Sequence, residues 1–252
     1  MTAPHPFRLD GKAVIVTGAS SGIGAGIARL AARSGADVLL VGRSRSRLAE
    51  LVQELRETGS SIASIAVDLR DDGAPEAVAA AALEAFDRID VLVNAAGIYR
   101  MASLDDTSDE IFDEHWEVNV RAPFRLTRAV HRHLEPGASI VFVSSMSGRV
   151  GSPNDSAYCA SKGAIELIVK ALATELAPAG IRVNAVAPGN VRTPINAELI
   201  TPELEAEILA TTPAGRIGEV DDIAPAVLYL ASDASRYVVG ASLAVDGGFT
   251  AQ

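Results

Sequence analysis

The chain of 252 residues has little cysteine, few aromatic residues and no long apolar runs. Its single cysteine excludes an intrachain disulfide and favours a reducing compartment, so we expect a cytoplasmic protein. The longest apolar runs are only strand-length, and the N-terminal residues lack the apolar run of a signal peptide. We therefore expect neither a membrane span nor a secretory leader.

Positive charge is also scarce. The chain has 22 Lys and Arg against 32 Asp and Glu, which gives a net charge of −10 and a pI near 4.9. An acidic surface repels nucleic-acid phosphates and anionic lipid headgroups, and an aromatic content of 4% leaves few side chains on which bases can stack. The composition argues against nucleic acid and membrane as partners.

Strand-like and helix-like segments alternate from one end of the chain to the other. Seven strand-like runs lie at residues 13–17, 37–42, 61–68, 89–97, 138–145, 181–188 and 242–248. Near-continuous apolar strands separated by helices indicate a parallel sheet that helices cover on both faces. No linker, compositional change or internal repeat interrupts the alternation. We predict a single doubly wound α/β domain of Rossmann type over residues 1–252, with a seven-stranded parallel sheet.

A glycine-rich turn joins the first strand to the first helix. Gly18, Gly22 and Gly24 follow the pattern G-x-x-x-G-x-G. Backbone N–H groups at such a turn can approach a pyrophosphate, and the dipole of the following helix favours its negative charge. A merely tight turn is the alternative, but the position after the first strand favours dinucleotide binding. The spacing differs from G-x-G-x-x-G and indicates a different branch of the fold.

The end of the second strand indicates which dinucleotide is bound. Gly42 stands where NAD-binding folds commonly carry an acidic residue, and Arg43 follows it. A guanidinium binds a 2′-phosphate through paired, charge-assisted hydrogen bonds, whereas a carboxylate repels it. The alternative is that Arg43, Arg45 and Arg47 form a solvated helix start. We favour NADP(H) as the cofactor, with NAD(H) as the second choice.

Tyr158 and Lys162 lie four residues apart in the segment YCASK, which opens a helical segment. Residues at this spacing share one face of a helix. Such a pair is commonly surface decoration, with the tyrosine ring packed on the lysine stem. However, ligands in doubly wound folds bind beyond the carboxyl ends of the strands, and one strand ends at Ser144–Ser145. Tyr158 and these serines can therefore reach one crevice.

Along nearly its whole length the chain resembles the short-chain dehydrogenase/reductase family, and within it the 3-oxoacyl-acyl-carrier-protein reductases. The motifs that carry the resemblance are TGASSGIG, NAAG (94–97), Asn119, Ser145, YCASK, PGNVRT (188–193) and the closing VDGG. The resemblance implies that Tyr158 is the general acid/base, that Lys162 is its electrostatic partner, and that Ser145 polarises the carbonyl. Ser145 is preferred to the neighbouring serines because its offset of thirteen residues from Tyr158 matches the family.

The chemistry of a tyrosine beside a lysine supports these roles. A free phenol titrates at about 10, too high for easy proton exchange at neutral pH. A nearby ammonium, together with the positive ring of the oxidised nicotinamide, favours the phenolate. We therefore expect Lys162 to lower the pKa of Tyr158. The resemblance also implies that Lys162 binds the nicotinamide ribose.

Asn119 precedes Pro123 by four residues in a long helical segment at 108–134. Proline has no N–H for the helical hydrogen bond to residue i−4, so the carbonyl of Asn119 is expected to lose its helical partner. Members of the family use a kink here to hold a water that connects to the catalytic lysine. The resemblance thus implies a proton-relay role for Asn119, and a purely structural kink is the alternative.

The resemblance also assigns cofactor contacts along the chain. Besides Arg43, Tyr158 and Lys162, the implied cofactor-binding residues are Gly18, Ser20, Ser21, Gly22, Ile23, Gly24, Asp68, Leu69, Asn94, Ala96, Gly97, Pro188, Gly189, Val191 and Thr193. Within this set, Asp68 and Leu69 are expected to flank the adenine, while Val191 and Thr193 receive the nicotinamide carboxamide. Each residue has an ordinary alternative as a turn former or strand terminator.

The histidines and the cysteine give no sign of a metal site. His131 and His133 are two residues apart and so do not share a helix face, and His5 and His115 are distant in sequence. Cys159 points about 100° around the helix from its neighbour Tyr158 and has no histidine partner. We expect no metal and treat Cys159 as a packing residue.

These features predict an oxidoreductase that moves a hydride between NADP(H) and a carbonyl or secondary alcohol. Acyl-carrier reductases need a basic surface near the entrance, so the acidic composition favours a small free carbonyl. One alternative is an NAD-linked sugar or polyol dehydrogenase on the same scaffold. Another is a nucleotide-sensing protein without turnover, against which the intact Ser145, Tyr158 and Lys162 argue.

The resemblance implies that the segment 190–212 covers the substrate. Arg192 is the only cation in this segment, and Met101, Val150 and Asn154 are candidate pocket residues. The resemblance also implies a homotetramer, built through the long fourth and fifth helices and the C-terminal strand. The segment 114–130 has apolar positions on more than one side, which is consistent with burial between subunits.

Overall fold

The computed structural model describes residues 6–197 and 200–251, so the predicted domain (1–252) and covering segment (190–212) each include residues outside this description. Seven parallel strands form one sheet in the order β3-β2-β1-β4-β5-β6-β7. Their bounds are β1 Ala13–Thr17, β2 Asp37–Gly42, β3 Ile62–Ala66, β4 Ile89–Asn94, β5 Leu134–Val143, β6 Arg182–Pro188 and β7 Ser242–Val245. The predicted doubly wound α/β fold is confirmed.

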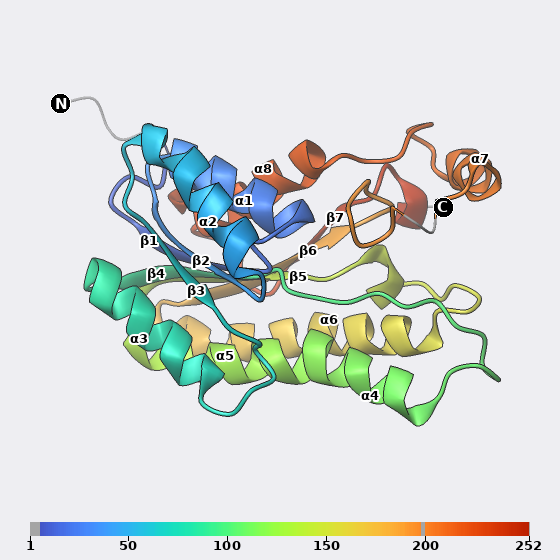
Figure 1. Cartoon of the computed structure of the whole chain (residues 1–252), viewed down its shortest axis with the longest axis horizontal. Coiled ribbons are helices and arrows are strands. Elements are labelled where there is room, and N and C mark those ends of the chain that lie inside the picture. The colour runs from blue at the N-terminus through green and yellow to red at the C-terminus, as the bar shows by residue number, and fades with distance from the viewer. Residues whose placement is uncertain (1–5, 198–199, 252) are drawn as a thin grey trace.

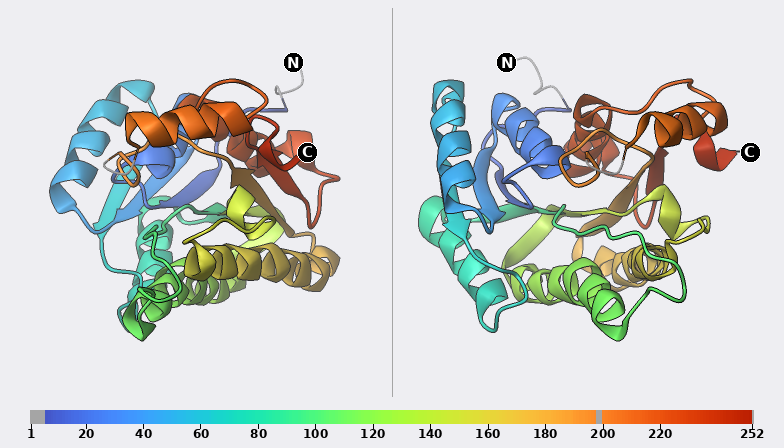
Figure 2. Two further views of the ribbon diagram at one scale, coloured as in Figure 1. Left: turned by 90° about the vertical axis from the view of Figure 1, so that its right-hand side faces the viewer. Right: turned by 45° about the vertical axis from the view of Figure 1, so that its right-hand side comes forward.

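Helices cover both faces of the sheet. They are α1 Gly22–Arg33, α2 Arg45–Leu55, α3 Ala74–Phe86, α4 Asp109–Trp116, α5 Ala122–Val130, α6 Ser156–Leu176, α7 Pro202–Thr211 and α8 Val220–Ala231. Figures 1 and 2 show α1, α2 and α8 on one face and α3, α4, α5 and α6 on the other. Among the helices of the described residues, none is long and apolar enough to cross a membrane.

Two apolar cores, one on each face, hold the layers together. Val14, Val16 and Leu40 turn toward α1 and α8, whereas Ile15 and Leu39 turn toward the α3, α5 and α6 side. Neighbouring residues of one strand thus face opposite layers, as the pleat requires. All of these residues are almost fully buried. This double burial explains why the strands read as unbroken apolar runs rather than alternating patterns.

The order of the strands places the site. β1 pairs with β2 on one side and with β4 on the other, so the direction of winding reverses between β1 and β4. In open sheets of this kind the reversal leaves a crevice beyond the carboxyl ends of the strands. The glycine turn follows β1 directly and therefore opens into that crevice.

The predicted long helix at 108–134 is divided. A π-helical turn, η2 (Glu117–Arg121), joins α4 to α5, and the N–H of Ala122 donates to the carbonyl of Glu117. Pro123 follows immediately and lacks the N–H that a regular helix needs at this point. The regular α-helix is therefore interrupted by one wide turn at this point, in an otherwise continuous run of helix.

Candidate active site

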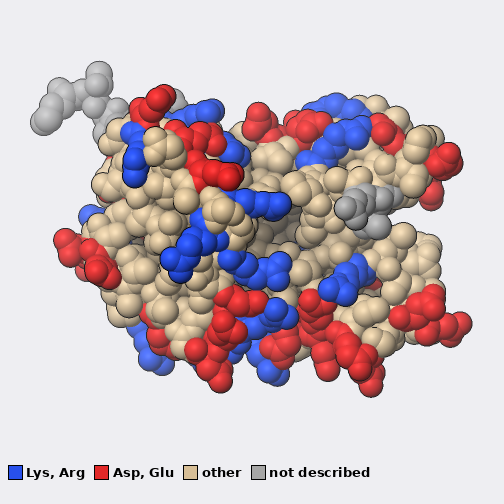
Figure 3. All heavy atoms as spheres, in the orientation of Figure 1, with Lys and Arg blue, Asp and Glu red and all other residues tan. Residues whose placement is uncertain are grey.

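A cavity of about 750 Å³ opens at the carboxyl ends of the strands. Its wall takes residues from the glycine turn, from the ends of β2, β4, β5 and β6, from the start of α6 and from α7. Figure 3 shows the hollow in the middle of one face of the molecule, with Lys and Arg side chains along its rim. The volume is in the range of small-molecule and cofactor sites, about 300–1,000 Å³.

Most of the predicted cofactor residues lie in this one wall. They are Gly18, Ser20, Ser21, Ile23, Gly24, Arg43, Asp68, Leu69, Ala96, Gly97, Tyr158, Lys162, Pro188, Gly189, Val191 and Thr193. The wall also includes the predicted catalytic Ser145. The topology therefore brings together residues that are spread over about two thirds of the chain.

Gly22 and Asn94 are exceptions, since the structure does not place them in the wall. A Cβ atom at Gly22 would lie 3.5 Å from the side chain of Thr193, which itself lines the cavity. Asn94 is buried and donates from Nδ2 to Oγ1 of Thr127 at 3.1 Å. Its side chain ties β4 to α5, and the expectation that the cofactor lies against the end of β4 here stays a prediction.

The glycine turn is packed too closely for side chains. Gly18 has a φ of +67°, and a Cβ atom there would lie 2.9 Å from the carbonyl oxygen of Ala95. A Cβ atom at Gly24 would clash with the carbonyl of Gly18. Oγ1 of Thr17 accepts hydrogen bonds from the N–H groups of Ala95 and Ala96 at 2.9 and 3.0 Å. This bare backbone cradle beside a helix N-terminus fits a pyrophosphate.

The side of the cavity that lies after β2 and β3 carries paired charges. Nη2 of Arg70 lies 2.7 Å from Oδ2 of Asp68, and this hydrogen bond holds the pKa of Asp68 below its usual value. Arg43 is exposed, lies in the same wall, and adds its positive charge to the lowering of that pKa. A Cβ atom at Gly42 would lie 3.2 Å from Oγ of Ser20, so an acidic side chain there would have to displace Ser20.

Tyr158 lies among three other ring or charged groups. Nζ of Lys162 is 5.7 Å from the centroid of the Tyr158 ring. The ring of Tyr99 meets it edge-on, with centroids 4.8 Å apart, and the ring of His115 lies 6.1 Å away. Tyr158 is therefore held in one orientation by its neighbours on α6, on α4 and on the loop after β4.

The prediction that Lys162 and the oxidised nicotinamide together lower the pKa of Tyr158 stays a prediction, because in the chain alone burial dominates this pKa. Burial raises the pKa of Tyr158 to about 12, and a hydrogen bond with Ser145 opposes this only in part. Burial also lowers the pKa of Lys162 to about 8, against the opposing charge of Glu166. Removal from water disfavours the phenolate and the ammonium alike.

Ser145 lies between the end of β5 and the start of α6. Its Oγ accepts a hydrogen bond from the N–H of Ser147 at 3.1 Å, which caps a short 3₁₀ turn, and the residue is 7% exposed. Ser144 and Ser147 also touch the cavity. Ser145 differs from them because its hydroxyl is hydrogen-bonded to Tyr158.

Asn119 is buried behind the wall rather than in it. Its Oδ1 accepts from the N–H of Ile98 at 2.8 Å, and its Nδ2 donates to the carbonyl of Ile98 and to Oγ of Ser161, both at 3.1 Å. A Cβ atom at Gly97 would lie 3.2 Å from Oδ1 of Asn119 and 3.7 Å from Nζ of Lys162. Asn119 thus fixes the loop after β4 against α6, next to Lys162.

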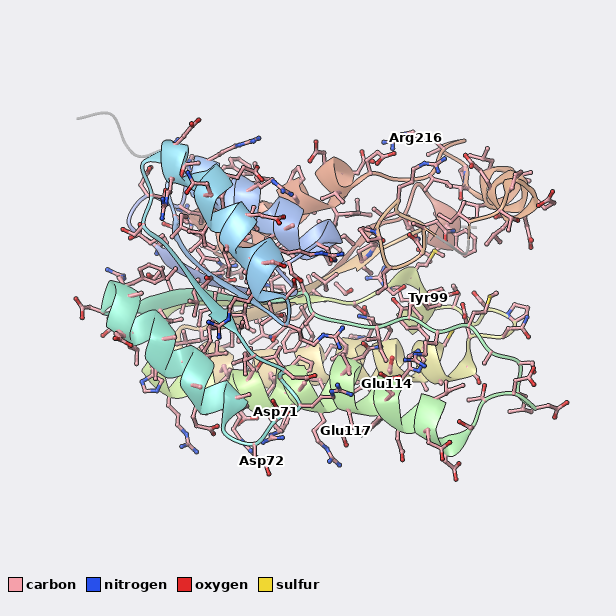
Figure 4. The ribbon with its side chains drawn as sticks, in the orientation of Figure 1. Asp71, Asp72, Tyr99, Glu114, Glu117 and Arg216 are labelled. Carbon is pink, nitrogen blue, oxygen red and sulfur yellow. The ribbon has the colours of Figure 1, made fainter. Side chains whose placement is uncertain are left out.

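Three residues at the site carry no sequence signature. The hydroxyl of Tyr99 donates to Oδ2 of Asp155 at 3.2 Å, and Figure 4 shows Tyr99 on the loop between β4 and α4. His115 is fully buried, with Nε2 accepting from the N–H of Arg100 at 3.2 Å and Nδ1 donating to the carbonyl of Ile111 at 2.8 Å. Tyr99, Asp155 and His115 can be assigned to the site only from their contacts in the structure, because their spacing in the chain matches no motif.

The predicted covering segment forms one side of the cavity. Its wall residues include Ile195, Asn196, Ile200, Leu204, Glu207, Ile208 and Thr211, while residues 198–199 lie outside the described part. Arg192 points elsewhere and pairs with Glu205 and, at 3.8 Å, with Glu219. α7 stands apart from the two main helical layers in Figure 2.

Two of the three other candidate pocket residues lie in the wall of the cavity. Met101 and Asn154 line the cavity, but Val150 does not. The thiol of Cys159 lies 3.8 Å from the carbonyl of Val150, which agrees with a packing role for this cysteine. Among residues 6–197 and 200–251, no group of three His, Cys, Asp or Glu side chains is placed to share a metal ion.

Comparisons with known proteins agree with this geometry. A family model described as enoyl-(acyl carrier protein) reductase matches residues 18–250. Galactitol 2-dehydrogenase (L-tagatose-forming) of Cereibacter sphaeroides is 44% identical over 250 residues, 97% of each chain. L-rhamnose 1-dehydrogenase (NAD(P)(+)) of Azotobacter vinelandii is 39% identical over 246 residues, 94% of this chain and 96% of the other. The crystal structure of a short-chain dehydrogenase/reductase, a glucose/ribitol dehydrogenase from Brucella melitensis, superposes with a TM-score of 0.91, at 33% identity and 97% and 99% coverage.

Proposed function

Because the chain belongs to the short-chain dehydrogenase/reductase family, whose members are NAD(P)-dependent enzymes of CH–OH and C=O groups, we propose that it is an NADP(H)-preferring oxidoreductase. Its substrate is a secondary alcohol or the corresponding ketone. One observation carries the proposal. A single cavity joins the glycine turn and Arg43 at one end to Ser145, Tyr158 and Lys162 at the other.

The residues present fit a dinucleotide along the length of this cavity. The backbone at Gly18 and Gly24 would hold the pyrophosphate, and Arg43 would pair with the 2′-phosphate. At the other end, Val191 and Thr193 would receive the carboxamide of the nicotinamide. The bound nicotinamide supplies or accepts the hydride.

Tyr158 moves the proton that accompanies the hydride. In reduction its hydroxyl gives a proton to the carbonyl oxygen as the carbonyl carbon gains the hydride, and the tyrosine is left as a phenolate. In oxidation the phenolate takes the proton of the alcohol. A pKa of about 12 keeps Tyr158 in its protonated form at neutral pH, so the proton donor is present, and neighbouring groups must stabilise the phenolate that the transfer leaves behind.

Ser145 and Lys162 support this transfer by different means. The hydroxyl of Ser145 lies next to Tyr158, where it can also donate to the carbonyl oxygen and stabilise its developing negative charge. Lys162 has a pKa of about 8 and so is mostly charged at neutral pH. Its ammonium donates to the carbonyl of Val143 at 2.9 Å and lies beside the Tyr158 ring, where it stabilises the phenolate.

Replacement of Arg43 by Asp tests the cofactor preference. A charge-assisted hydrogen bond contributes about 1.5–3 kcal/mol, so affinity for NADP(H) should fall at least about tenfold, with little loss of NAD(H) affinity. Arg45→Asp is the matched control, because Arg45 is exposed nearby but does not line the cavity. Unchanged NADP(H) affinity in Arg43→Asp, or an equal loss in Arg45→Asp, contradicts the assignment.

A sugar or polyol dehydrogenase linked to NAD is the second candidate. It is favoured by the two relatives that are named as galactitol and L-rhamnose dehydrogenases. A panel of polyols, aldoses and simple ketones, each with both cofactors, separates the two candidates. Turnover of polyols with NAD⁺ alone favours this second assignment.

We also propose that the enzyme is a homotetramer. Phe112, Trp116 and Phe124 project from α4 and α5 and are 45%, 40% and 40% exposed, and Leu243 on β7 is 39% exposed. Large apolar side chains grouped on two helices favour an interface between copies. Light scattering in solution should give four times the chain mass of 26.1 kDa, and a monomer contradicts the proposal.

A further inference from the structure

Asp155 is a buried carboxyl group three residues before Tyr158, at the N-terminal end of α6. The residue is 9% exposed and belongs to the wall of the cavity. Its Oδ2 accepts from the hydroxyl of Tyr99, but Oδ1 has no hydrogen-bond partner among the residues that the structure describes. It makes no side-chain cap to α6 either. Burial of an oxygen without a partner costs free energy, so a helix-capping role does not explain this side chain.

Tyr99 connects this carboxyl group to the catalytic ring. Its hydroxyl is 3.2 Å from Oδ2 of Asp155, while its ring meets Tyr158 edge-on with centroids 4.8 Å apart. The backbone of the two loops is joined as well, since the N–H of Ala102 donates to the carbonyl of Asn154 at 2.8 Å. Asp155, Tyr99 and Tyr158 therefore form one rigid corner of the cavity.

Other charged and titratable groups also lie around Tyr158. On α6, Lys162 lies beside the ring, where its ammonium favours the phenolate. Cys159 donates from Sγ to the carbonyl of Val150 and makes a smaller contribution than Asp155 to raising the pKa of Tyr158. On α4, both ring nitrogens of His115 are used in hydrogen bonds to the backbone, and this residue acts on the carboxyl group of Asp155. Glu166 lies one turn beyond Lys162 and acts on that lysine.

The nearby arginines are occupied elsewhere. Arg100, on the loop after β4, pairs with Glu114 at 3.0 Å. Arg149, which follows the 3₁₀ turn after β5, lies 3.7 Å from Glu166. Among the described residues, Asp155 is therefore the one carboxylate that opposes a negative charge on Tyr158 directly, since Glu166 acts through Lys162.

We propose that Asp155 is a positioning residue which, held in place by Tyr99, keeps Tyr158 in its protonated form and adapts the site to reduction of a ketone. The inference rests on the proposed function, in which Tyr158 transfers the proton. A carboxylate and a phenolate in one buried corner repel each other, so the tyrosine retains its proton. Burial and the charge of Asp155 both raise the pKa of Tyr158. Oxidation of an alcohol then requires alkaline pH, whereas reduction proceeds near neutrality.

Asp155→Asn tests the inference by removing the charge and keeping the shape. The phenolate of Tyr158 is followed by ultraviolet titration, as the difference between each protein and its counterpart that also carries Tyr158→Phe, with and without NADP⁺. Loss of a nearby like charge should lower the midpoint by about one pH unit, a tenfold gain of phenolate at a given pH. The acid limb of the pH profile for alcohol oxidation should move with it. An unchanged midpoint overturns the inference.

A second variant and a control keep the test decisive if Asp155→Asn folds poorly. Tyr99→Phe keeps the ring against Tyr158 but removes the hydroxyl that holds Oδ2 of Asp155, so that the carboxylate is no longer fixed in this corner and repels Tyr158 less. Its Tyr158 midpoint should also fall, and a rise contradicts the inference. Asp113→Asn removes an exposed carboxylate from α4, and its midpoint should equal that of the unmodified chain.

The same proteins separate this inference from the proposed function. If Tyr158→Phe keeps full turnover, the proposed function is wrong, whatever Asp155 does. If Tyr158→Phe loses turnover but Asp155→Asn leaves the titration and the pH profile unchanged, only the role of Asp155 is wrong.

Discussion

Replacement of Lys162 by Met should stabilise the chain at neutral pH, although Lys162 is central to the site. The residue is 6% exposed, and burial lowers its pKa from 10.5 to about 8. At about 1.4 kcal/mol per pKa unit, holding this charged group in the fold costs about 3 kcal/mol below pH 8. Met removes that cost and also removes the hydrogen bond to the carbonyl of Val143, worth about 1 kcal/mol.

The dependence on pH identifies the cause. Because the folded-state pKa of Lys162 lies below its unfolded value, the unfolded chain binds more protons between about pH 8 and 10.5, and stability rises with pH across this window. Lys162→Met should therefore be more stable than the unmodified chain by about 2 kcal/mol at pH 7, and this advantage should be gone near pH 10.5.

Urea denaturation of both proteins at several pH values measures the difference. Lys170→Met is the matched control, because Lys170 is exposed on the same helix, and its effect should not vary with pH in this way. A constant difference between Lys162→Met and the unmodified chain from pH 7 to 10.5 would refute the reasoning. It would mean that the ammonium is not held at a cost in the folded state.

Two further substitutions test the supports of the site. Asn119→Ala removes three hydrogen bonds, two to Ile98 and one to Ser161. The free energy of unfolding should therefore fall by about 2–4 kcal/mol, and turnover should slow. An unchanged stability in urea would contradict this. Gly24→Ala places a methyl group against the carbonyl of Gly18. Calorimetry should therefore show an affinity for NADP(H) that is at least about tenfold weaker. An unchanged affinity would show that the turn can move aside.

The strands and their parallel arrangement could be predicted because both faces of the sheet are buried. Runs such as Ala13–Thr17 are apolar at every position, which leaves little alternative to a central strand. The ends of the strands were less predictable. β5 begins at Leu134 rather than at 138, because Leu134 makes a single pairing with Ile89 across an irregular register. Such a pairing depends on the neighbouring strand and leaves no pattern in the sequence.

Tyr158, Lys162 and Ser145 could be predicted because they lie close together in the chain, on one helix and on the strand end before it. Tyr99 and Asp155 could not, because their contact depends on how two loops pack against each other. The effect of burial on the pKa of Tyr158 could not be predicted for the same reason. Spacing along a helix shows that a lysine is near, but it does not show how completely the layers around the pair exclude water.

For Arg43 and Asp68, the sequence predicted the general position but not every contact. The sequence predicted that Arg43 binds a 2′-phosphate, and the resemblance implied that Asp68 flanks the adenine; the structure places both residues in the wall of the cavity. The sequence did not predict that Arg70 would hold the carboxylate of Asp68, because a pair two residues apart in a loop depends on the local turn. Contacts within a motif are therefore predictable, and contacts between loops are not.

Turnover by Tyr158→Phe is the most direct test of the central claim, that the hydroxyl of Tyr158 transfers the proton. With NADPH and a ketone from the panel, turnover should fall by about 10²–10⁴, the usual contribution of a general acid. Affinity for NADPH should stay within about tenfold, since a single hydrogen bond is lost. Full turnover by this variant would contradict the account. Tight NADPH binding by the unmodified chain with no turnover of any carbonyl would also contradict it, and would instead indicate a nucleotide sensor.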